Sequence, residues 1–170
     1  MIGIDVFIGS SLEGLPIAQQ VQYELHHLTA PRLWTQGVFE PGGSTLRSLL
    51  KEVRSHDFAV LVLSPDDTTT SREATSTSPR DNVIFELGLF MGRLGPNRTF
   101  LLYDKSSNLK IMSDFDGITK VPYDGQWAQA DLPAAIGTAC TPITQAIRRL
   151  GPFRGRDHGF RKDSEIADDW

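Results

Sequence analysis

The chain has 170 residues, of which 39% are hydrophobic and 22% are charged, and its formal net charge is −4. This length and composition fit one soluble globular domain, and the acidic balance excludes a basic surface for direct nucleic-acid binding. The single cysteine, Cys140, excludes an internal disulfide framework and a cysteine-rich zinc module. No apolar run is long enough to span a membrane, and the first residues lack the pattern of a signal peptide, so we expect a cytoplasmic protein without membrane contact.

Short apolar runs alternate with amphipathic segments along the chain, a pattern that predicts strands alternating with helices. In chain order we expect a strand at residues 4–8, a helix at 17–28, a strand at 33–34, a helix at 46–53, a strand at 58–63, a helix at 78–94, strands at 99–103 and 118–121, and a closing helix at 134–150. Such alternation predicts an α/β fold in which helices cover both faces of a parallel sheet.

The segment between the third predicted strand and the third predicted helix is unusual in composition. Residues 68–78 are mostly Ser and Thr without apolar periodicity, and we expect a mobile loop there. The helix that follows has clear start signals, with Ser78 as its cap, Pro79 at its first position and Asp81 as a capping-box acid. Gly95–Pro96 is a typical helix end.

Polar residues gather at one edge of the predicted sheet. Ligands of parallel sheets bind beyond the carboxyl ends of the strands, at the point where the strand order reverses. The predicted strands place residues 9–11, 34–35, 64–66 and Asp104 at that edge. We therefore look for binding residues among these segments.

One carboxylate stands out in the helix predicted at 78–94. Between residues 83 and 92 the only polar side chain is Glu86. A helix that is apolar on nearly all faces is buried, and a carboxylate there costs free energy unless it is paired or is needed by a ligand. Burial also raises the pKa of a carboxyl group, as happens at catalytic acids. The alternative is an ordinary ion pair with Arg80 or Arg93.

Three segments together resemble one protein family: Val6–Gly14, Asp57–Asp67 and Pro79–Gly95, the last with an Asn-Val-Ile-Phe-Glu-Leu-Gly core at 82–88. They are similar to the bacterial TIR-like, predicted nucleotide-binding domains that act as effectors in anti-phage defence systems. Those domains are often joined to a cyclic-nucleotide sensor, such as a STING-like domain. The resemblance implies a flavodoxin-like TIR fold, with five parallel strands and helices on both faces.

The same resemblance implies an activity. It is the hydrolysis of NAD+ to nicotinamide and ADP-ribose or cyclic ADP-ribose, with NAD+ as substrate, no cofactor, and Glu86 as the catalytic residue. It also implies homo-oligomers through TIR–TIR contacts, and a cyclic-nucleotide sensor as domain or partner. We assign the TIR-like NAD-hydrolase domain to residues 1–152 and expect a polar tail or linker at 153–170, where apolar residues are few.

A single carboxylate suits this chemistry. Glycosidic cleavage passes through an oxocarbenium-like state, and most glycosidases need a second carboxyl group to protonate the leaving group. Nicotinamide in NAD+ is a cationic pyridinium and leaves as a neutral molecule, so no general acid is required. Glu86 can then hydrogen-bond the ribose hydroxyls and stabilise the developing positive charge. Whether Glu86 also attacks covalently stays open.

The other candidate binding residues follow the first two strands. Gly9, Ser10 and Ser11 form a loop that can hydrogen-bond ribose or phosphate, although an ordinary turn is an equal alternative. Trp34 ends the second strand, and Phe39 lies in the next loop, which matches the BB loop of TIR domains. Either ring can stack on nicotinamide or adenine, but aromatic residues at such positions often belong to the core.

Two further candidates, Arg80 and Asn82, lie at the start of the helix that carries Glu86. They can meet phosphate or ribose there, and solvated cap residues are the alternative. The four histidines of the chain show no metal-ligand spacing, so we expect no metal site.

Three other functions compete with NAD+ hydrolysis. A non-catalytic TIR module that signals by homotypic assembly is the main alternative, although assembly alone gives no reason to retain Glu86. A phosphate-accepting receiver domain would use Asp66–Asp67, but it also needs an acidic pair where this chain has residues 9–11. A nucleoside 2-deoxyribosyltransferase resembles the segment 85–88, but no nucleobase-binding residues are identifiable. For the enzyme, we expect activity to require self-association, with residues 67–78 ordering on assembly.

Overall fold

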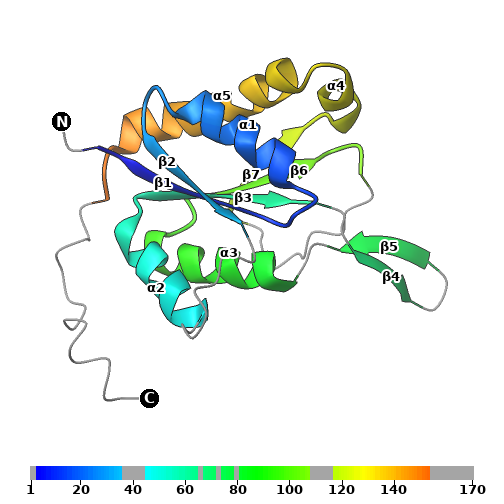
Figure 1. Cartoon of the computed structure of the whole chain (residues 1–170), viewed down its shortest axis with the longest axis horizontal. Coiled ribbons are helices and arrows are strands. Elements are labelled where there is room, and N and C mark those ends of the chain that lie inside the picture. The colour runs from blue at the N-terminus through cyan, green and yellow to red at the C-terminus, as the bar shows by residue number, and fades with distance from the viewer. Residues whose placement is uncertain are drawn as a thin grey trace.

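The computed structural model describes residues 3–35, 45–64, 67–71, 74–78, 81–107 and 117–153, and the structural statements below concern those residues. Five strands form one parallel sheet in the order β2-β1-β3-β6-β7 (Figure 1). Their bounds are β1 (Asp5–Ser10), β2 (Ala30–Thr35), β3 (Phe58–Leu63), β6 (Thr99–Asp104) and β7 (Thr119–Tyr123). The predicted α/β fold with a five-stranded parallel sheet is confirmed, and the strand order reverses between β1 and β3.

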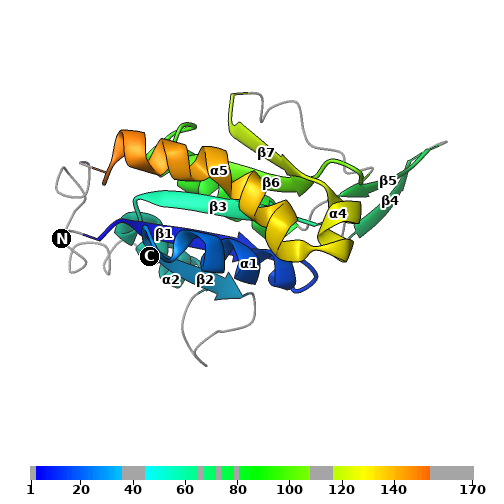
Figure 2. The ribbon, with the colours of Figure 1, turned by 90° about the horizontal axis from the view of Figure 1, so that it is seen from above.

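Helices cover both faces of this sheet. On one face lie α1 (Leu15–Leu25) and α5 (Leu132–Leu150), side by side, with the short α4 (Gly125–Ala130) next to α5 (Figures 1 and 2). On the other face lie α2 (Thr45–Ser55) and α3 (Asp81–Leu94). Because successive side chains of a strand point to opposite faces, each strand contributes to two separate cores.

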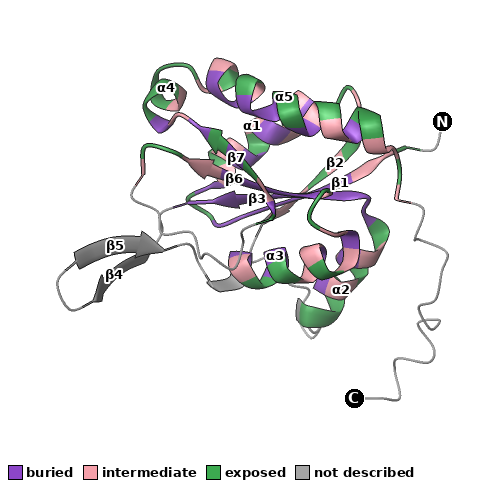
Figure 3. Cartoon of the chain, turned by 180° about the vertical axis from the view of Figure 1, so that it is seen from behind, coloured by how far each residue is buried: buried purple, intermediate pink, exposed green. Residues whose placement is uncertain are grey.

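The two cores are assembled from alternate strand residues. On β1, Val6 and Ile8 pack against α1 and α5, whereas Phe7 packs against α2 and α3. Every residue of β3 is buried, as expected for the central strand of a doubly covered sheet. Figure 3 shows these buried strands between helices whose outer faces are exposed. Residue 9 of β1 therefore points to the same face as Phe7, toward α3.

The predicted mobile loop at residues 68–78 is wrong. Two strands, β4 (Asp67–Ser71) and β5 (Ala74–Ser78), pair antiparallel as a hairpin that projects away from the main sheet (Figure 1). Thr is β-branched and favours strands, and a two-stranded ladder of backbone hydrogen bonds needs no apolar face. Apolar periodicity therefore does not detect this hairpin.

The start of α3 also differs from its prediction. Ser78 is the last residue of β5 rather than a helix cap, and α3 begins at Asp81; Pro79 lies outside the described residues. The predicted end is confirmed, because α3 stops at Leu94 and Gly95 takes φ = 79°, a conformation that glycine adopts without strain. The helix is not buried on nearly all faces, since Phe85 is 53% exposed.

At the amino ends of the strands, the carboxylate of Asp57 joins three distant segments. Asp57 is fully buried, and its two oxygens accept hydrogen bonds from the backbone N–H groups of Asp5 and Phe153, each at 2.9 Å. The guanidinium groups of Arg93 and Arg98 lie 4.7 and 5.3 Å from the centre of the Phe153 ring. The segment that follows α5 is thereby fixed to β1, β3 and α3.

Phe153 is the first residue of the tail expected at 153–170, and this division into domain and tail stays a prediction. Residues 154–170 lie outside the described part of the chain. Among the helices of the described residues, none is both long enough and apolar enough to cross a membrane.

The Asp57 contacts predict a large loss of stability on substitution. Replacing Asp57 by Ala leaves two partly buried backbone N–H groups without this acceptor, which lowers the free energy of unfolding by about 3 kcal/mol. Asp57→Asn keeps the shape and one acceptor oxygen, so about half of that loss is expected. Urea denaturation followed by circular dichroism measures both values. An Asp57→Ala variant with an unchanged urea midpoint would contradict the assignment.

Candidate functional site

Glu86 lies on the packing face of α3 rather than on its exposed side. Val83, Leu87 and Phe90 form the buried stripe of this helix at helical spacing, and Glu86 lies between them. Glu86 is itself only 4% exposed. The prediction of a buried carboxylate in an apolar helix is therefore confirmed.

The carboxylate of Glu86 lies against the carboxyl end of β1. A Cβ atom at Gly9 would lie 2.7 Å from Oε2 of Glu86, 2.7 Å from Cδ1 of Leu61 and 2.9 Å from Cε1 of Phe7. These distances are shorter than normal contacts, so a larger residue at position 9 requires the side-chain ends of Glu86, Leu61 and Phe7 to shift. Gly9 and Glu86, both predicted site residues, are thus neighbours at the point where the strand order reverses.

The loop after β1 has two serines with different surroundings. Ser10 is 1% exposed, and its Oγ has no hydrogen-bond partner among the described residues. The Oγ of Ser11 instead accepts a hydrogen bond from the backbone N–H of Gly14 at 3.3 Å. Ser11 therefore serves the turn itself, whereas the Oγ of Ser10 is a buried polar atom that the described residues leave unsatisfied.

The N-terminus of α1 is a poor anion site, although it follows this loop. The N–H of Gly14 is used by Ser11, the N–H of Leu15 donates to the carbonyl of Leu12 at 3.2 Å, and Pro16 has no N–H. Phosphate binding at a helix N-terminus needs free N–H groups, and most of those at α1 are occupied. This arrangement favours the neighbourhood of Gly9 and Ser10 over α1 itself.

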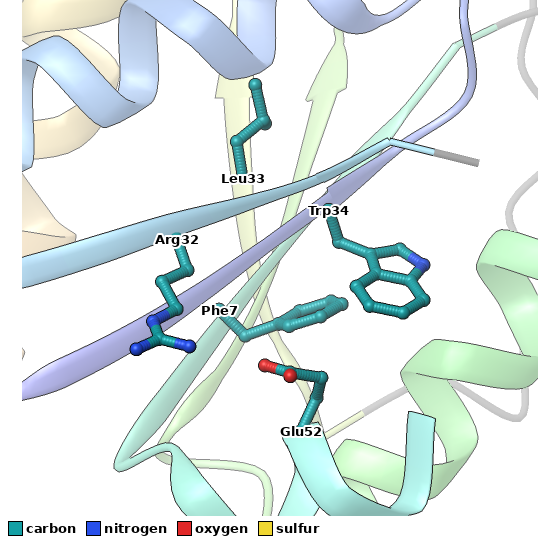
Figure 4. A pocket seen from close by; sticks show the side chains of 5 residues that line it. All are labelled: Phe7, Arg32, Leu33, Trp34 and Glu52. Atoms are coloured by element: carbon teal, nitrogen blue, oxygen red, sulfur yellow. The ribbon is translucent and has the colours of Figure 1, made fainter. Parts of the chain in front are cut away.

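Trp34 belongs to an aromatic cluster around Phe7. The Phe7 ring centre lies 6.2 Å from that of Trp34, 4.3 Å from that of Phe90 and 5.6 Å from that of His56. Trp34 also lines a hollow of about 190 Å³ between β2 and α2 (Figure 4). The five residues that line it are Phe7, Arg32, Leu33, Trp34 and Glu52.

The other residues predicted for the site add little to its described geometry. Phe39 and Arg80 lie outside the described residues, and Asn82 lies in the first turn of α3. Asp104 does lie at the predicted edge, but its Oδ1 already accepts hydrogen bonds from the backbone N–H groups of Gly125 and Ser106. Its role is to hold the loops after β6 and β7.

Neither the shifted pKa of Tyr123 nor the second hollow in the described residues adds a binding site beside Glu86. Burial, and then the charge of Asp104, raises the pKa of Tyr123 to about 12, so this hydroxyl stays protonated. A hollow of about 290 Å³ between β7, α4 and α5 contains none of the predicted site residues. In the described part of the chain, no group of three or more His, Cys, Asp and Glu residues could hold a metal ion.

Sequence reasoning missed Phe7, Arg32 and Glu52 as lining residues. Phe7 looks like an ordinary core residue because it lies in the middle of an apolar strand. Arg32 and Glu52 are twenty positions apart and form no motif, so only the packing of α2 on β2 brings them together.

Known proteins match this chain over most of its length. Residues 5–125 match the family described as "CAP12/Pycsar effector protein, TIR domain". The Pycsar effector protein PaPycTIR of Pseudomonas aeruginosa is 43% identical over 86% of this chain and 48% of its own length. BcPycTIR of Burkholderia cepacia is 41% identical over a match that covers 87% of this chain and 49% of BcPycTIR. CD-NTase-associated protein 12 of Flavobacterium daejeonense is 46% identical over a match that covers 67% of this chain and 36% of its own length. The chain therefore spans about half the length of the two Pycsar relatives, and less of the third.

Solved structures support the fold. The flavodoxin-like domain of a Synechococcus sp. protein superposes with a TM-score of 0.52 at 15% identity, covering 85% of this chain and 99% of that one. The diflavin flavoprotein A3 of Nostoc sp. superposes with a TM-score of 0.54 at 13% identity, covering 88% of this chain and 96% of that one. Such low identities show a shared fold alone, and they confirm the flavodoxin-like architecture.

The contact at Gly9 predicts opposite effects for two glycines. Gly9→Ala forces a Cβ into Glu86 and Leu61, which lowers the free energy of unfolding by about 1–3 kcal/mol. Gly88→Ala is the matched control, because Gly88 is exposed on α3 with nothing within 4 Å of its Cβ position. It is expected to raise stability by about 0.5–1 kcal/mol through helix propensity. Urea denaturation compares the two, and equal effects would refute the close contact.

Proposed function

Because the chain belongs to the CAP12/Pycsar effector TIR-domain family, we propose that it is an NAD+ glycohydrolase domain that acts as an effector in anti-phage defence. It cleaves NAD+ into nicotinamide and ADP-ribose or cyclic ADP-ribose, with NAD+ as the substrate and no further cofactor. Loss of NAD+ is the output of the effector, and its place of action is the cytoplasm.

One observation carries this proposal. The carboxylate of Glu86 is held, 4% exposed, against Gly9 at the carboxyl end of β1, where the strand order of the sheet reverses. Ligands of such sheets bind at this point. A carboxylate so far from bulk water also interacts more strongly with a nearby positive charge than a solvated one does.

The chemistry needs one such carboxylate. Cleavage breaks the bond between C1′ of the ribose and the pyridinium nitrogen, and the electron pair leaves with the nitrogen, so nicotinamide departs neutral. Positive charge then develops on the ribose, where Glu86 stabilises it and hydrogen-bonds the ribose hydroxyls. Water adds at C1′ and loses a proton to give ADP-ribose, whereas attack by a ring nitrogen of adenine gives the cyclic product. Ser10 offers its buried hydroxyl to the same ligand.

The part of each relative that lies outside the match with this chain suggests how the domain is controlled. The names of the relatives describe Pycsar effectors and a CD-NTase-associated protein. We propose that this domain works with a cyclic-nucleotide sensor, either as a further domain or as a separate partner. Sensor binding brings copies of the domain together, and TIR–TIR contacts between them switch the activity on.

The first test is the role of Glu86. Incubation of concentrated protein with NAD+, followed by chromatography, is expected to show release of nicotinamide. Glu86→Gln keeps the shape of the side chain and removes its charge, so nicotinamide release falls at least about a hundredfold while the melting temperature stays close to that of the wild type. Glu24→Gln, on α1 beyond the other face of the sheet, is the matched control and keeps full activity. A fully active Glu86→Gln variant would sink the assignment and leave an assembly module.

The second test is the dependence on assembly. Specific activity is expected to rise with protein concentration and to level off once the assemblies are saturated, because association follows mass action. Equal specific activity in dilute and concentrated protein would refute this part. The hairpin β4–β5 forms within a single chain, so ordering of residues 67–78 on assembly is not part of this proposal.

A further inference from the structure

The outer side of β2 is an open strand edge. β2 is the last strand on its side of the sheet, and among the described residues no segment pairs with its outer edge. Ala30 donates its backbone N–H to the carbonyl of Ile4, so the backbone of Ala30 faces β1. In a parallel ladder, alternate residues of a strand face the same neighbour. The backbone groups of Pro31, Leu33 and Thr35 therefore point outward, away from β1.

These outward groups are only partly covered. The carbonyl of Pro31 accepts a hydrogen bond from Nε2 of Gln22 on α1 at 3.1 Å, and Pro31 has no N–H to offer. In the part of the chain that the structure describes, the outward N–H and carbonyl of Leu33 make no hydrogen bond. A strand edge with such unused backbone groups is a template for pairing with another strand.

The two side chains that flank Leu33 lie together on the α2 face of β2. Arg32 and Trp34 line the hollow between β2 and α2 with Glu52, whereas the Leu33 side chain packs on the opposite face (Figure 4). Arg32 is exposed and makes no ion pair or hydrogen bond with another described residue. The edge thus carries a cation that no described residue pairs, beside an aromatic ring and an acid.

We propose that β2 pairs antiparallel with β2 of a second copy of this chain, around a two-fold axis at Leu33. The two Leu33 residues then exchange both backbone hydrogen bonds, as directly opposed residues do at alternate positions of an antiparallel ladder. Thr35 of each copy donates its N–H to the carbonyl of Pro31 of the other copy, which has a second lone pair besides the one that Gln22 uses. The same surface is used by both copies, so the contact closes as a dimer.

The side chains of β2 select this register. An axis at Arg32 would place two like charges directly opposite each other, which is unfavourable. An axis at Trp34 would place Arg32 opposite residue 36, beyond the end of β2. An axis at Pro31 would oppose two residues that have no N–H. The axis at Leu33 instead places each Arg32 directly opposite Trp34 of the other copy.

This arrangement makes the surface complementary to itself. Directly opposed side chains of an antiparallel pair have Cβ atoms about 5 Å apart, so the guanidinium of Arg32 can lie over the indole of Trp34 of the other copy. Glu52 lines the same hollow as that indole and has the opposite charge. Both Arg32 side chains thus gain partners at once. A contact of one strand pair is small, so the dimer is weak and forms where copies are concentrated.

The inference goes beyond NAD+ hydrolysis, because it names a surface through which two copies of the domain contact each other. Such contacts are what the proposed assembly requires. The pairing itself rests on the strand geometry and the charges of β2 rather than on the proposed activity.

Amide hydrogen exchange followed by NMR tests the pairing on the unmodified protein. The N–H groups of Leu33 and Thr35 are expected to exchange at least about fivefold more slowly in concentrated than in dilute protein, because a second copy protects them. The N–H groups of Arg32 and Trp34 face β1 and are the internal control, with slow exchange at both concentrations. Exchange at Leu33 that does not change with concentration overturns the proposal: slow exchange would place another segment of the same chain on this edge, and fast exchange would leave it open.

A charge reversal tests the side chains. Arg32→Glu is expected to raise the dissociation constant of the dimer, measured by sedimentation equilibrium, at least about tenfold, because it removes the cation over Trp34 and places an acid beside Glu52. Arg149→Glu, at an exposed position on α5, changes the net charge equally and is the matched control. Equal dissociation constants for the two variants overturn the assignment, and melting temperatures show that both are folded.

These measurements contain no NAD+, so they are independent of turnover. A protein that pairs through β2 without releasing nicotinamide from NAD+ refutes the proposed activity and retains the surface. A protein that releases nicotinamide but never pairs through β2 refutes only the surface.

Discussion

The carboxylate of Glu86 reaches the backbone of β1 only because residue 9 has no side chain. Any Cβ at this position would overlap Glu86, Leu61 and Phe7 at once. With a larger residue at position 9, the ends of these three side chains would have to shift. The present positions of the Glu86 carboxylate, the Leu61 methyl group and the Phe7 ring thus go together with the absence of a Cβ atom at residue 9.

The opposite edge of the sheet holds α3 in place. The buried Asp57 carboxylate ties the starts of β1 and β3 to the segment after α5, and Phe153 of that segment contacts Arg93 near the end of α3. Glu86 and Arg93 lie seven positions apart on the same helix, about two turns of an α-helix. The helix that carries the acid is therefore packed along its length and anchored where the chain leaves the last helix.

At the carboxyl ends of the strands, the two faces of the sheet carry different chemical groups. On the α1 face, most of the backbone N–H groups at the helix start are already occupied, and the buried Oγ of Ser10 has no hydrogen-bond partner among the described residues. On the α2 and α3 face lie an acid, an aromatic cluster and the hollow with Arg32 and Glu52. Flavodoxin-like sheets bind ligands at the strand-order reversal. In this chain the reactive groups gather on the α3 side of that point.

The amino-acid sequence alone determined the alternation of strands and helices, the central strand at 58–63 and the anomalous acid at position 86, because these depend on local apolar periodicity. It also placed Gly9 and Trp34 at the carboxyl edge of the sheet, since parallel strands end together. The hairpin at 67–78 was not predicted from the sequence, because Ser and Thr strands that pair through their backbones show no apolar pattern. Only the tertiary structure decided that Gly9 faces Glu86 and that Arg32 faces the same hollow as Glu52. Such contacts join residues far apart in the chain, and strand register and helix packing set them.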